Sequence, residues 1–217
     1  MKHTLAPLAL PLIAASLTVA VPAEAATDSL LVIGDSWTEG VGDRVSSNGL
    51  GWAPVTASLL GMPLTQDGKG GSGYVNRTTY GDNTFGQRVY RHPADAYDVV
   101  ILQGSTNDKA YVSTLASNAN MTLKAAKKRY PSALIVVVGP TAISGTPDAA
   151  TVKVNDKLRA AAWAADVPFI DAIGEGWFRP GIAWKDNPYV DQATGHPSDA
   201  GYRVVGEHVA SDVANLS

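Results

Sequence analysis

A serine and a histidine stand near opposite ends of the chain, each in a short turn expected beyond a strand. Ser36 lies in the segment GDSW (34–37), directly after the apolar run 30–33, and His196 opens the segment HPSDAGY (196–202). A serine hydroxyl is a weak nucleophile unless an imidazole within hydrogen-bond reach takes its proton. Such partners can be far apart in sequence when the fold brings strand ends together. The pair therefore indicates a serine hydrolase.

Both residues also have a purely structural interpretation. A serine that opens a helix commonly caps it, and histidines occur at surfaces and in cores. Of the other histidines, His3 lies in the N-terminal leader, His92 in a His-Pro loop and His208 within the last expected helix. Only His196 precedes a helix start in a Gly/Pro-flanked loop after the final strand, which favours it as the partner of Ser36.

Two further polar loops follow expected strands. Asn107, in QGSTND (103–108), can form a turn or donate its side-chain amide to a developing oxyanion. The segment QDGKGGSGY (66–74) contains a G-x-G-x-x-G string. A dinucleotide site requires this string after the first strand and before a helix, whereas here it follows the second strand and precedes a polar, turn-rich segment. Its glycines either form a flexible turn or let backbone amides approach a ligand closely.

Apolar runs and helical stretches alternate along the whole chain. We predict strands over 30–33, 62–66, 98–103, 133–139 and 167–171, and helices over 51–60, 113–129, 147–165 and 199–215. This alternation predicts an α/β fold, with a parallel sheet covered by helices on both faces. Sites in such sheets gather at the carboxyl ends of the strands, which is where Ser36, the Gly70–Gly71 pair and Asn107 fall.

Together these four loops resemble the SGNH (GDSL) hydrolase family, in the family's order and over essentially the whole mature chain. GDSW matches the nucleophile block, GKGGSGY the glycine block, STND the asparagine block and GHPSDAGY the histidine block. The resemblance implies a three-layer α/β/α sandwich with a five-stranded parallel sheet, the flavodoxin-like SGNH fold. The chain has no G-x-S-x-G elbow, which argues against the larger α/β-hydrolase family.

The resemblance also implies roles for individual residues. Ser36 becomes the nucleophile and His196 the base. The amides of Ser36 and Gly71 and the side chain of Asn107 become the oxyanion hole. Gly70 is the alternative to Gly71, because two adjacent glycines leave the alignment ambiguous by one position. No metal and no cofactor is expected.

The histidine block departs from the family pattern at its acid. The family usually places an acid three residues before the histidine, where this chain has Ala193, and Asp191 lies five residues before His196. If two residues loop out, Asp191 reaches the imidazole. Otherwise a backbone carbonyl near Ala193 orients the ring and leaves a Ser–His dyad. The acid fixes the tautomer and stabilises the imidazolium, and a carbonyl dipole can do the first of these; we favour Asp191.

The N-terminus has the pattern of a secretory leader. A short basic start is followed by an apolar stretch over 5–21 and by the A-x-A site 23–25. We predict a signal peptide over 1–25, cleaved near Ala25, and a secreted single SGNH-type hydrolase domain over 26–217. A retained N-terminal anchor is the alternative.

Charge and cysteine content exclude several classes of function. The chain of 217 residues has a net charge of −3 and no cysteine. It therefore has no basic field to hold nucleic acid, and thiol catalysis and cysteine-bound zinc are excluded. We expect no nucleic-acid partner and no stable membrane insertion.

The leading hypothesis is a secreted serine esterase that forms an acyl-enzyme on Ser36. No long hydrophobic lid is visible, so short acyl groups on glycans or on small esters are favoured over long-chain lipids. The aromatic residues Trp37, Trp177, Phe178, Trp184 and Tyr189 either stack on a substrate or pack the loops.

Two other classes remain open. A catalytically weak or inactive glycan- or lipid-binding module on the same fold is supported by the missing acid at Ala193. A metal-dependent deacetylase or a paired-carboxylate glycosidase is less favoured, because the chain has no H-x-x-H or H-x-x-E-H cluster.

Overall fold

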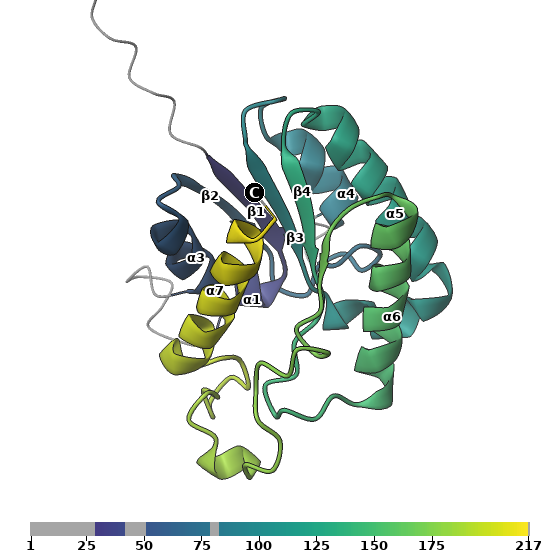
Figure 1. Ribbon diagram of the computed structural model, residues 1–217. Coiled ribbons are helices and arrows are strands. Elements are labelled where there is room, and N and C mark those ends of the chain that lie inside the picture. The colour runs from purple at the N-terminus through teal and green to yellow at the C-terminus, as the bar shows by residue number, and fades with distance from the viewer. Residues whose placement is uncertain (1–28, 42–50, 79–82, 217) are drawn as a thin grey trace, which may run out of the picture.

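A five-stranded parallel sheet forms the centre of the computed structural model, which describes residues 29–41, 51–78 and 83–216 (Figure 1). The strands are β1 (Leu30–Gly34), β2 (Leu64–Gly68), β3 (Val99–Gln103), β4 (Leu134–Val138) and β5 (Phe169–Ile170). They lie in the order β2-β1-β3-β4-β5. This is the flavodoxin-like doubly wound order, in which ligands bind where the strand order reverses, beside β1 and β3. The predicted signal peptide lies outside the described residues.

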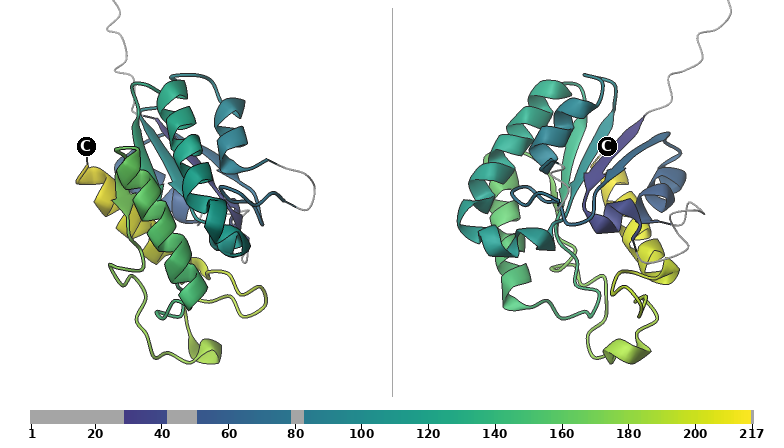
Figure 2. Two further views of the ribbon diagram at one scale, coloured as in Figure 1. Left: turned by 90° about the vertical axis from the view of Figure 1, so that its right-hand side faces the viewer. Right: turned by 180° about the vertical axis from the view of Figure 1, so that it is seen from behind.

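Helices cover both faces of this sheet, as Figure 2 shows from two sides. The helices α3 (Trp52–Leu60) and α7 (Asp199–Ala214) pack on one face, and α4 (Phe85–Arg88), α5 (Val112–Arg129) and α6 (Ala149–Ala164) pack on the other. The short helix α1 (Ser36–Glu39) follows β1, and the 3₁₀ turns are η1 (Val89–Arg91), η2 (Thr106–Tyr111) and η3 (Trp184–Asp186). The predicted three-layer α/β fold is therefore confirmed.

The central strands are apolar up to their carboxyl ends, where β3 ends in the buried Gln103, because both of their faces are buried. All five residues of β1 and of β3 are buried. Leu30 and Val32 contribute to the core under α3 and α7, whereas Leu31 and Ile33 contribute to the core under α5 and α6. This alternation of side chains fixes the register of β1, and thereby the place where its polar carboxyl end emerges.

The central strands β1, β3 and β4 lie within one residue of the predicted bounds, and the two outer strands differ by more. β2 spans 64–68 instead of 62–66, and β5 has two residues instead of five. Both strands lie at an edge of the sheet, where one side has no neighbour and the apolar signal is weak. The parallel register places Asp67 opposite Ile33 and Gly68 opposite Gly34. Polar residues of β2 therefore end level with the turn that carries Ser36.

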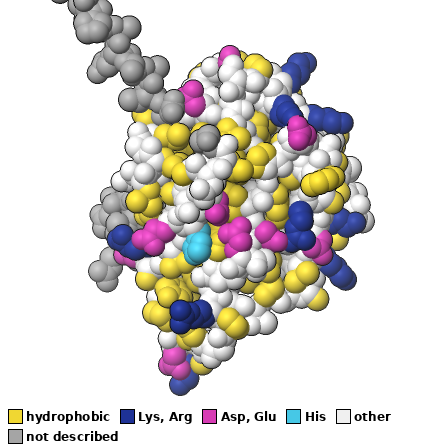
Figure 3. Space-filling view, in the orientation of Figure 1, with side chains coloured by type: hydrophobic (Ala, Val, Ile, Leu, Met, Phe, Trp, Pro, Cys, Tyr) yellow, Lys and Arg dark blue, Asp and Glu magenta, His cyan; other side chains and the backbone are white. Residues whose placement is uncertain are grey.

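The visible surface carries both signs of charge, with acidic and basic side chains interspersed across the face in Figure 3. Lysine and arginine side chains gather at its right-hand edge, over α5 and α6. Within residues 29–41, 51–78 and 83–216, no helix is both long and apolar enough to cross a membrane.

Candidate active site

The nucleophile candidate Ser36 is the first residue of α1, at the carboxyl end of β1. The Asp35 side chain caps this helix, and its Oδ1 accepts the Trp37 amide at 3.0 Å. Amides in the first turn of a helix have no partner within the helix. The Ser36 amide contacts no acceptor within the described part of the chain. It is therefore free to donate to a substrate.

Ser36 and His196 meet across the end of the sheet. The His196 Nε2 atom lies 2.9 Å from Ser36 Oγ, although the residues are 160 positions apart. On the other side of the ring, Nδ1 lies 3.1 Å from the Thr194 carbonyl oxygen. Because a carbonyl has no proton to donate, this contact requires the hydrogen on Nδ1. Nε2 is then unprotonated and accepts the Ser36 hydroxyl, which is the arrangement of a general base.

Asp191, favoured above as the acid, does not occupy the position beside Nδ1. Its Oδ1 accepts the Ala193 amide at 3.0 Å, and its Oδ2 accepts the Thr194 hydroxyl at 2.6 Å. The Thr194 hydroxyl also lowers the pKa of this carboxyl below its ordinary value. Asp191 therefore shapes the turn that carries His196, and the structure corrects the expected pairing. The alternative, a ring oriented by a backbone carbonyl, matches the geometry one residue further on than Ala193.

Asp191→Asn is accordingly expected to lower kcat by less than about 10-fold. The asparagine side chain can still accept from the Ala193 amide, and the change removes a nearby charge but no hydrogen-bond partner of the ring. A triad carboxylate would be worth about 10⁴-fold in kcat. Steady-state hydrolysis of p-nitrophenyl acetate distinguishes a residue that shapes the turn from a triad acid. A loss of kcat near 10⁴-fold would show that Asp191 is the acid.

The glycine loop after β2 passes beside Ser36. A Cβ atom added to Gly70 would lie 3.7 Å from the Ser36 Cβ. The Gly70 amide donates to Glu39 Oε2 at 2.6 Å, whereas the Gly71 amide donates to no described residue. Gly71 has a φ of +76°, a conformation that side chains rarely adopt. Of the two glycines, the hydrogen bonding thus leaves Gly71 available as an oxyanion donor.

Asn107 lies next to the same loop. Its Nδ2 donates one hydrogen to the Ser72 carbonyl at 2.9 Å. Since a side-chain amide carries two hydrogens, the second remains for a ligand. The contact ties the Asn107 side chain to Ser72, the residue after Gly71, in the same loop. The structure thus brings Ser36, His196, Gly71 and Asn107 to one end of the sheet.

Other residues brace the loop and were missed in the sequence. Ser105 Oγ donates to the Ser72 carbonyl at 2.9 Å. The buried Asp108 accepts the amides of Tyr74, Val75 and Asn76 at 2.8–3.1 Å. Burial raises the pKa of Asp108. Its position directly after Asn107 was a signal that could have identified it.

Asp35 couples the nucleophile turn to pH. Desolvation raises the pKa of this buried carboxyl from 3.8 to about 6. Below pH 3.8 the group is neutral in both the folded and the unfolded protein. As the pH rises from 3.8 toward 6, the carboxyl ionises in the unfolded protein before it ionises in the folded protein. The free energy of unfolding therefore falls over this range. A pKa of about 6 in place of 3.8 corresponds to roughly 3 kcal/mol in the free energy of unfolding.

Asp35→Asn, which keeps a good capping residue, is therefore expected to gain up to about 3 kcal/mol in free energy of unfolding relative to wild type between pH 4 and pH 7. Denaturant titrations at several pH values measure this. Asp148→Asn, at the N-cap of α6, is the control of opposite sign, because Lys109 lowers the pKa of Asp148 to about 2. A pH-independent difference between Asp35→Asn and wild type would contradict the account.

A cavity of about 320 Å³ opens beside the Ser–His pair, and its walls include Asp35, Trp37 and Gly195, the chain neighbours of the two residues. Trp184, which is 48% exposed, also lines it. Trp177 and Phe178 are buried, and Phe178 packs against Tyr189 with ring centroids 5.4 Å apart. The aromatic cluster is thus divided: Trp37 and Trp184 line the cavity, whereas Trp177 stacks on His208 of α7 and Phe178 packs with Tyr189.

A doubly wound parallel sheet that brings a serine, a histidine and free amides to its carboxyl end is the arrangement that a serine hydrolase requires. The chain belongs to the GDSL-like lipase/acylhydrolase family, whose model matches residues 32–204. It is 31% identical over 191 residues to a GDSL lipase from Mycobacterium tuberculosis, an alignment covering 82% of this chain and 78% of that protein. These findings place the chain among the carboxylic-ester hydrolases.

Solved structures share the fold at lower sequence identity. The native aryl esterase of Mycobacterium smegmatis has a TM-score of 0.64 and 20% identity, over 88% of this chain and all of that one. A carbohydrate acetylesterase from Sinorhizobium meliloti has a TM-score of 0.63 and 20% identity, with the same coverage. At this identity the likeness shows the SGNH fold and no more.

Proposed function

We propose that the protein is a secreted serine esterase that removes short acyl groups from glycans or small esters through an acyl-enzyme on Ser36. The observation that carries the proposal is the 2.9 Å contact between Ser36 Oγ and His196 Nε2, with Nδ1 held by the Thr194 carbonyl. Secretion rests on the predicted leader over 1–25.

In the first half-reaction, Ser36 Oγ bonds to the ester carbonyl carbon while its proton passes to His196 Nε2. The electron pair of the C=O bond moves onto the oxygen, beside the Ser36 and Gly71 amides and the second hydrogen of Asn107 Nδ2. Donors placed in advance at such a charge lower the barrier to the tetrahedral intermediate. The intermediate then expels the alcohol, as its C–O bond breaks and the imidazolium returns the proton to the departing oxygen.

In the second half-reaction, water attacks the acyl-enzyme and gives one proton to Nε2. The bond between the carbonyl carbon and Ser36 Oγ breaks, the proton returns to Oγ, and the free acid leaves. The imidazolium formed twice in this cycle is stabilised directly by a carbonyl dipole. The buried Asp35 carboxyl, which interacts electrostatically with His196, adds negative charge when it is ionised.

The cavity favours a short acyl group and a polar alcohol. Its volume of about 320 Å³ is at the lower end of ligand sites. A long alkyl chain would lie against hydroxyls and an ion pair and gain little from burial, whereas a sugar ring can stack on indole and bond to these groups. The polar lining includes Thr106, Thr141, Ser144, Thr146, Thr151 and the Lys109–Asp148 pair, joined at 2.7 Å.

The relatives are compatible with this choice. Structural neighbours include proteins described as carbohydrate acetylesterases and as an aryl esterase. These descriptions apply to those proteins. They make esters of small acyl groups with a sugar or an aryl alcohol the first class of substrate to test on this chain.

A chain-length panel tests the proposal. We expect kcat/KM to be highest for p-nitrophenyl acetate, lower for the butyrate and lowest for the octanoate, and acetylated oligosaccharides to release acetate. Trp184→Ala should raise KM for the acetylated oligosaccharide more than for the aryl acetate, because only the sugar loses a stacking surface. Wild-type preference for the octanoate would contradict the proposal.

One observation favours a second candidate, a glycan-binding module with weak turnover. No carboxylate within the described ranges contacts His196 Nδ1, so stabilisation of the imidazolium depends on the Thr194 carbonyl dipole and on the longer-range charges of Asp35 and Asp191. Sugar binding by wild type, with no acetate released at any pH between 5 and 9, would support the module.

A further inference from the structure

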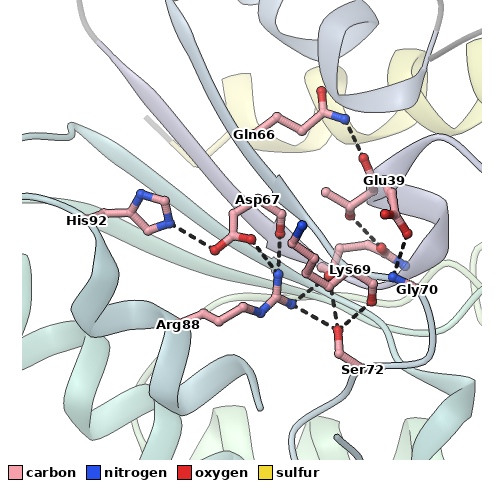
Figure 4. Close-up of polar contacts among 11 residues, drawn as sticks. Glu39, Gln66, Asp67, Lys69, Gly70, Ser72, Arg88 and His92 are labelled. Atoms are coloured by element: carbon pink, nitrogen blue, oxygen red, sulfur yellow. Dashed lines mark hydrogen bonds and ion pairs between the residues drawn. The ribbon is translucent and has the colours of Figure 1, made fainter. Parts of the chain in front are cut away.

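A buried arginine connects the turn that carries Ser36 to the glycine loop after β2. Arg88, the last residue of α4, is fully buried at the end of the sheet. Figure 4 shows its guanidinium between Asp67 of β2 and Ser72 of the glycine loop. Nη2 donates to the Gly34 carbonyl at 2.7 Å and to Ser72 Oγ at 3.1 Å. Gly34 lies two residues before Ser36, and Ser72 lies one residue after Gly71.

The other end of the guanidinium is held by β2. Nη1 donates to the Asp67 carbonyl and to Asp67 Oδ1, both at 2.7 Å. The second carboxylate oxygen, Oδ2, contacts His92 Nε2 at 3.0 Å. The contacts with Arg88 and His92 lower the pKa of Asp67 despite its burial. Four of the five guanidinium hydrogens are therefore used, in a planar geometry that a lysine ammonium cannot reproduce.

Ser72 is the residue through which Arg88 contacts the glycine loop. Its hydroxyl donates to the Lys69 carbonyl at 2.6 Å, so its lone pairs face Arg88. The Ser72 carbonyl accepts two further hydrogen bonds, from the Ser105 hydroxyl and from the Asn107 side-chain amide. Ser72, the residue directly after Gly71, is thus held by Arg88 through its hydroxyl and by Asn107 through its carbonyl.

A stabilising role alone accounts poorly for Arg88. Its Nε is buried and has no partner among the described residues. An unsatisfied buried donor costs about 1–3 kcal/mol, and a buried ion pair gives little net stability compared with well-packed apolar residues. What the arginine does provide is a fixed separation between three chain segments that meet at Ser36.

We propose that Arg88 is a positioning residue for ester hydrolysis, which sets the distance between the Ser36 turn and the Gly71 amide through Gly34 and Ser72. The inference rests on the proposed function of the same site. A misplacement of about 1 Å in a catalytic group can cost about 10²-fold in rate. Arg88 touches no reacting atom, so its loss should lower kcat and leave the affinity for substrate nearly unchanged.

The test compares kcat, KM and thermal unfolding for Arg88→Lys, Arg88→Met and wild type with p-nitrophenyl acetate. We expect Arg88→Lys to lower kcat by about 10- to 100-fold with less than a 3-fold change in KM, and Arg88→Met to lower it further. Tyr130→Phe is the matched control. It removes a buried hydrogen bond of 2.6 Å to the Val89 carbonyl, next to Arg88, but no link to the site. It should lower the unfolding temperature and keep kcat within about 2-fold.

A double-mutant cycle separates positioning from stability. Ser72→Ala removes the link between Arg88 and the loop, together with the hydroxyl's contact to the Lys69 carbonyl, and leaves the contacts of Arg88 with Gly34 and Asp67 in place. It should lower kcat by about 3- to 10-fold, and the double variant Arg88→Lys/Ser72→Ala should be little worse than Arg88→Lys. Ser72→Ala also serves as the test if neither Arg88 variant folds. A kcat within 2-fold of wild type in folded Arg88→Lys or in Ser72→Ala, or losses that simply multiply, would overturn the inference. Wild-type hydrolysis that survives Ser36→Ala would instead overturn the proposed function, and the inference with it.

Discussion

His196→Ala is expected to lower kcat for p-nitrophenyl acetate by roughly 10⁴- to 10⁶-fold, with the protein still folded. The imidazole is the group positioned to take the Ser36 proton, and its Nε2 lies 2.9 Å from Oγ. Without it, the hydroxyl must attack while holding its proton. The Ser36 and Gly71 amides and Asn107 would remain, so a residual rate above that in water should persist.

The controls for this prediction are a second histidine and a double variant. His208 lies on α7, and its ring stacks on that of Trp177 with centroids 5.0 Å apart. His208→Ala removes this ring and should leave kcat nearly unchanged. Ser36→Ala/His196→Ala should be no slower than either single variant, because the two side chains act as one unit. Multiplicative losses, or a loss under 10-fold in His196→Ala, would show that another group is the base.

Asn107→Ala has the second largest expected effect, a loss of about 10²- to 10³-fold in kcat. In the proposed mechanism its second Nδ2 hydrogen donates to the oxyanion, and this interaction is strongest in the transition state. Interactions made solely in the transition state lower kcat and kcat/KM equally. KM should therefore change little, and steady-state kinetics on the acetyl ester measure both parameters.

Asn107 also holds the Ser72 carbonyl, so a loss of loop order must be separated from a loss of the donor. Ser105→Ala provides the comparison, because Ser105 Oγ donates to the same carbonyl at the same distance, 2.9 Å. Asn118→Ala, at a half-buried position of α5 away from the site, controls for the substitution itself. Equal losses in Ser105→Ala and Asn107→Ala would argue against a direct role of Asn107 in the oxyanion hole.

The sheet and the approximate position of the site follow from local patterns. Apolar runs such as 30–33 and 98–103 lie in central strands, where burial on both faces makes the signal strong. Ser36 and Asn107 follow these strands directly. Doubly wound topology brings the ends of β1 and β3 together, so the sequence predicted their neighbourhood without any contact being known.

The contacts that complete the site could not be predicted, because they depend on backbone groups and distant segments. The Thr194 carbonyl at His196 Nδ1 is present in any sequence, and only the conformation of its turn places it there. Asp191 was favoured by residue type, but its oxygens are taken by its own turn. Arg88 lies in a helix of four residues, too short for a periodic pattern, and its partners are 16 to 54 positions away.

The most direct test of the central claim is the site at which a fluorophosphonate probe reacts with the wild-type protein. Such a probe bonds to a serine whose hydroxyl is activated by a base. Mass spectrometry of the digested protein should find the adduct on Ser36, and His196→Ala should prevent its formation. An unlabelled Ser36 in protein that still hydrolyses the acetyl ester, or an adduct on another serine, would contradict the account.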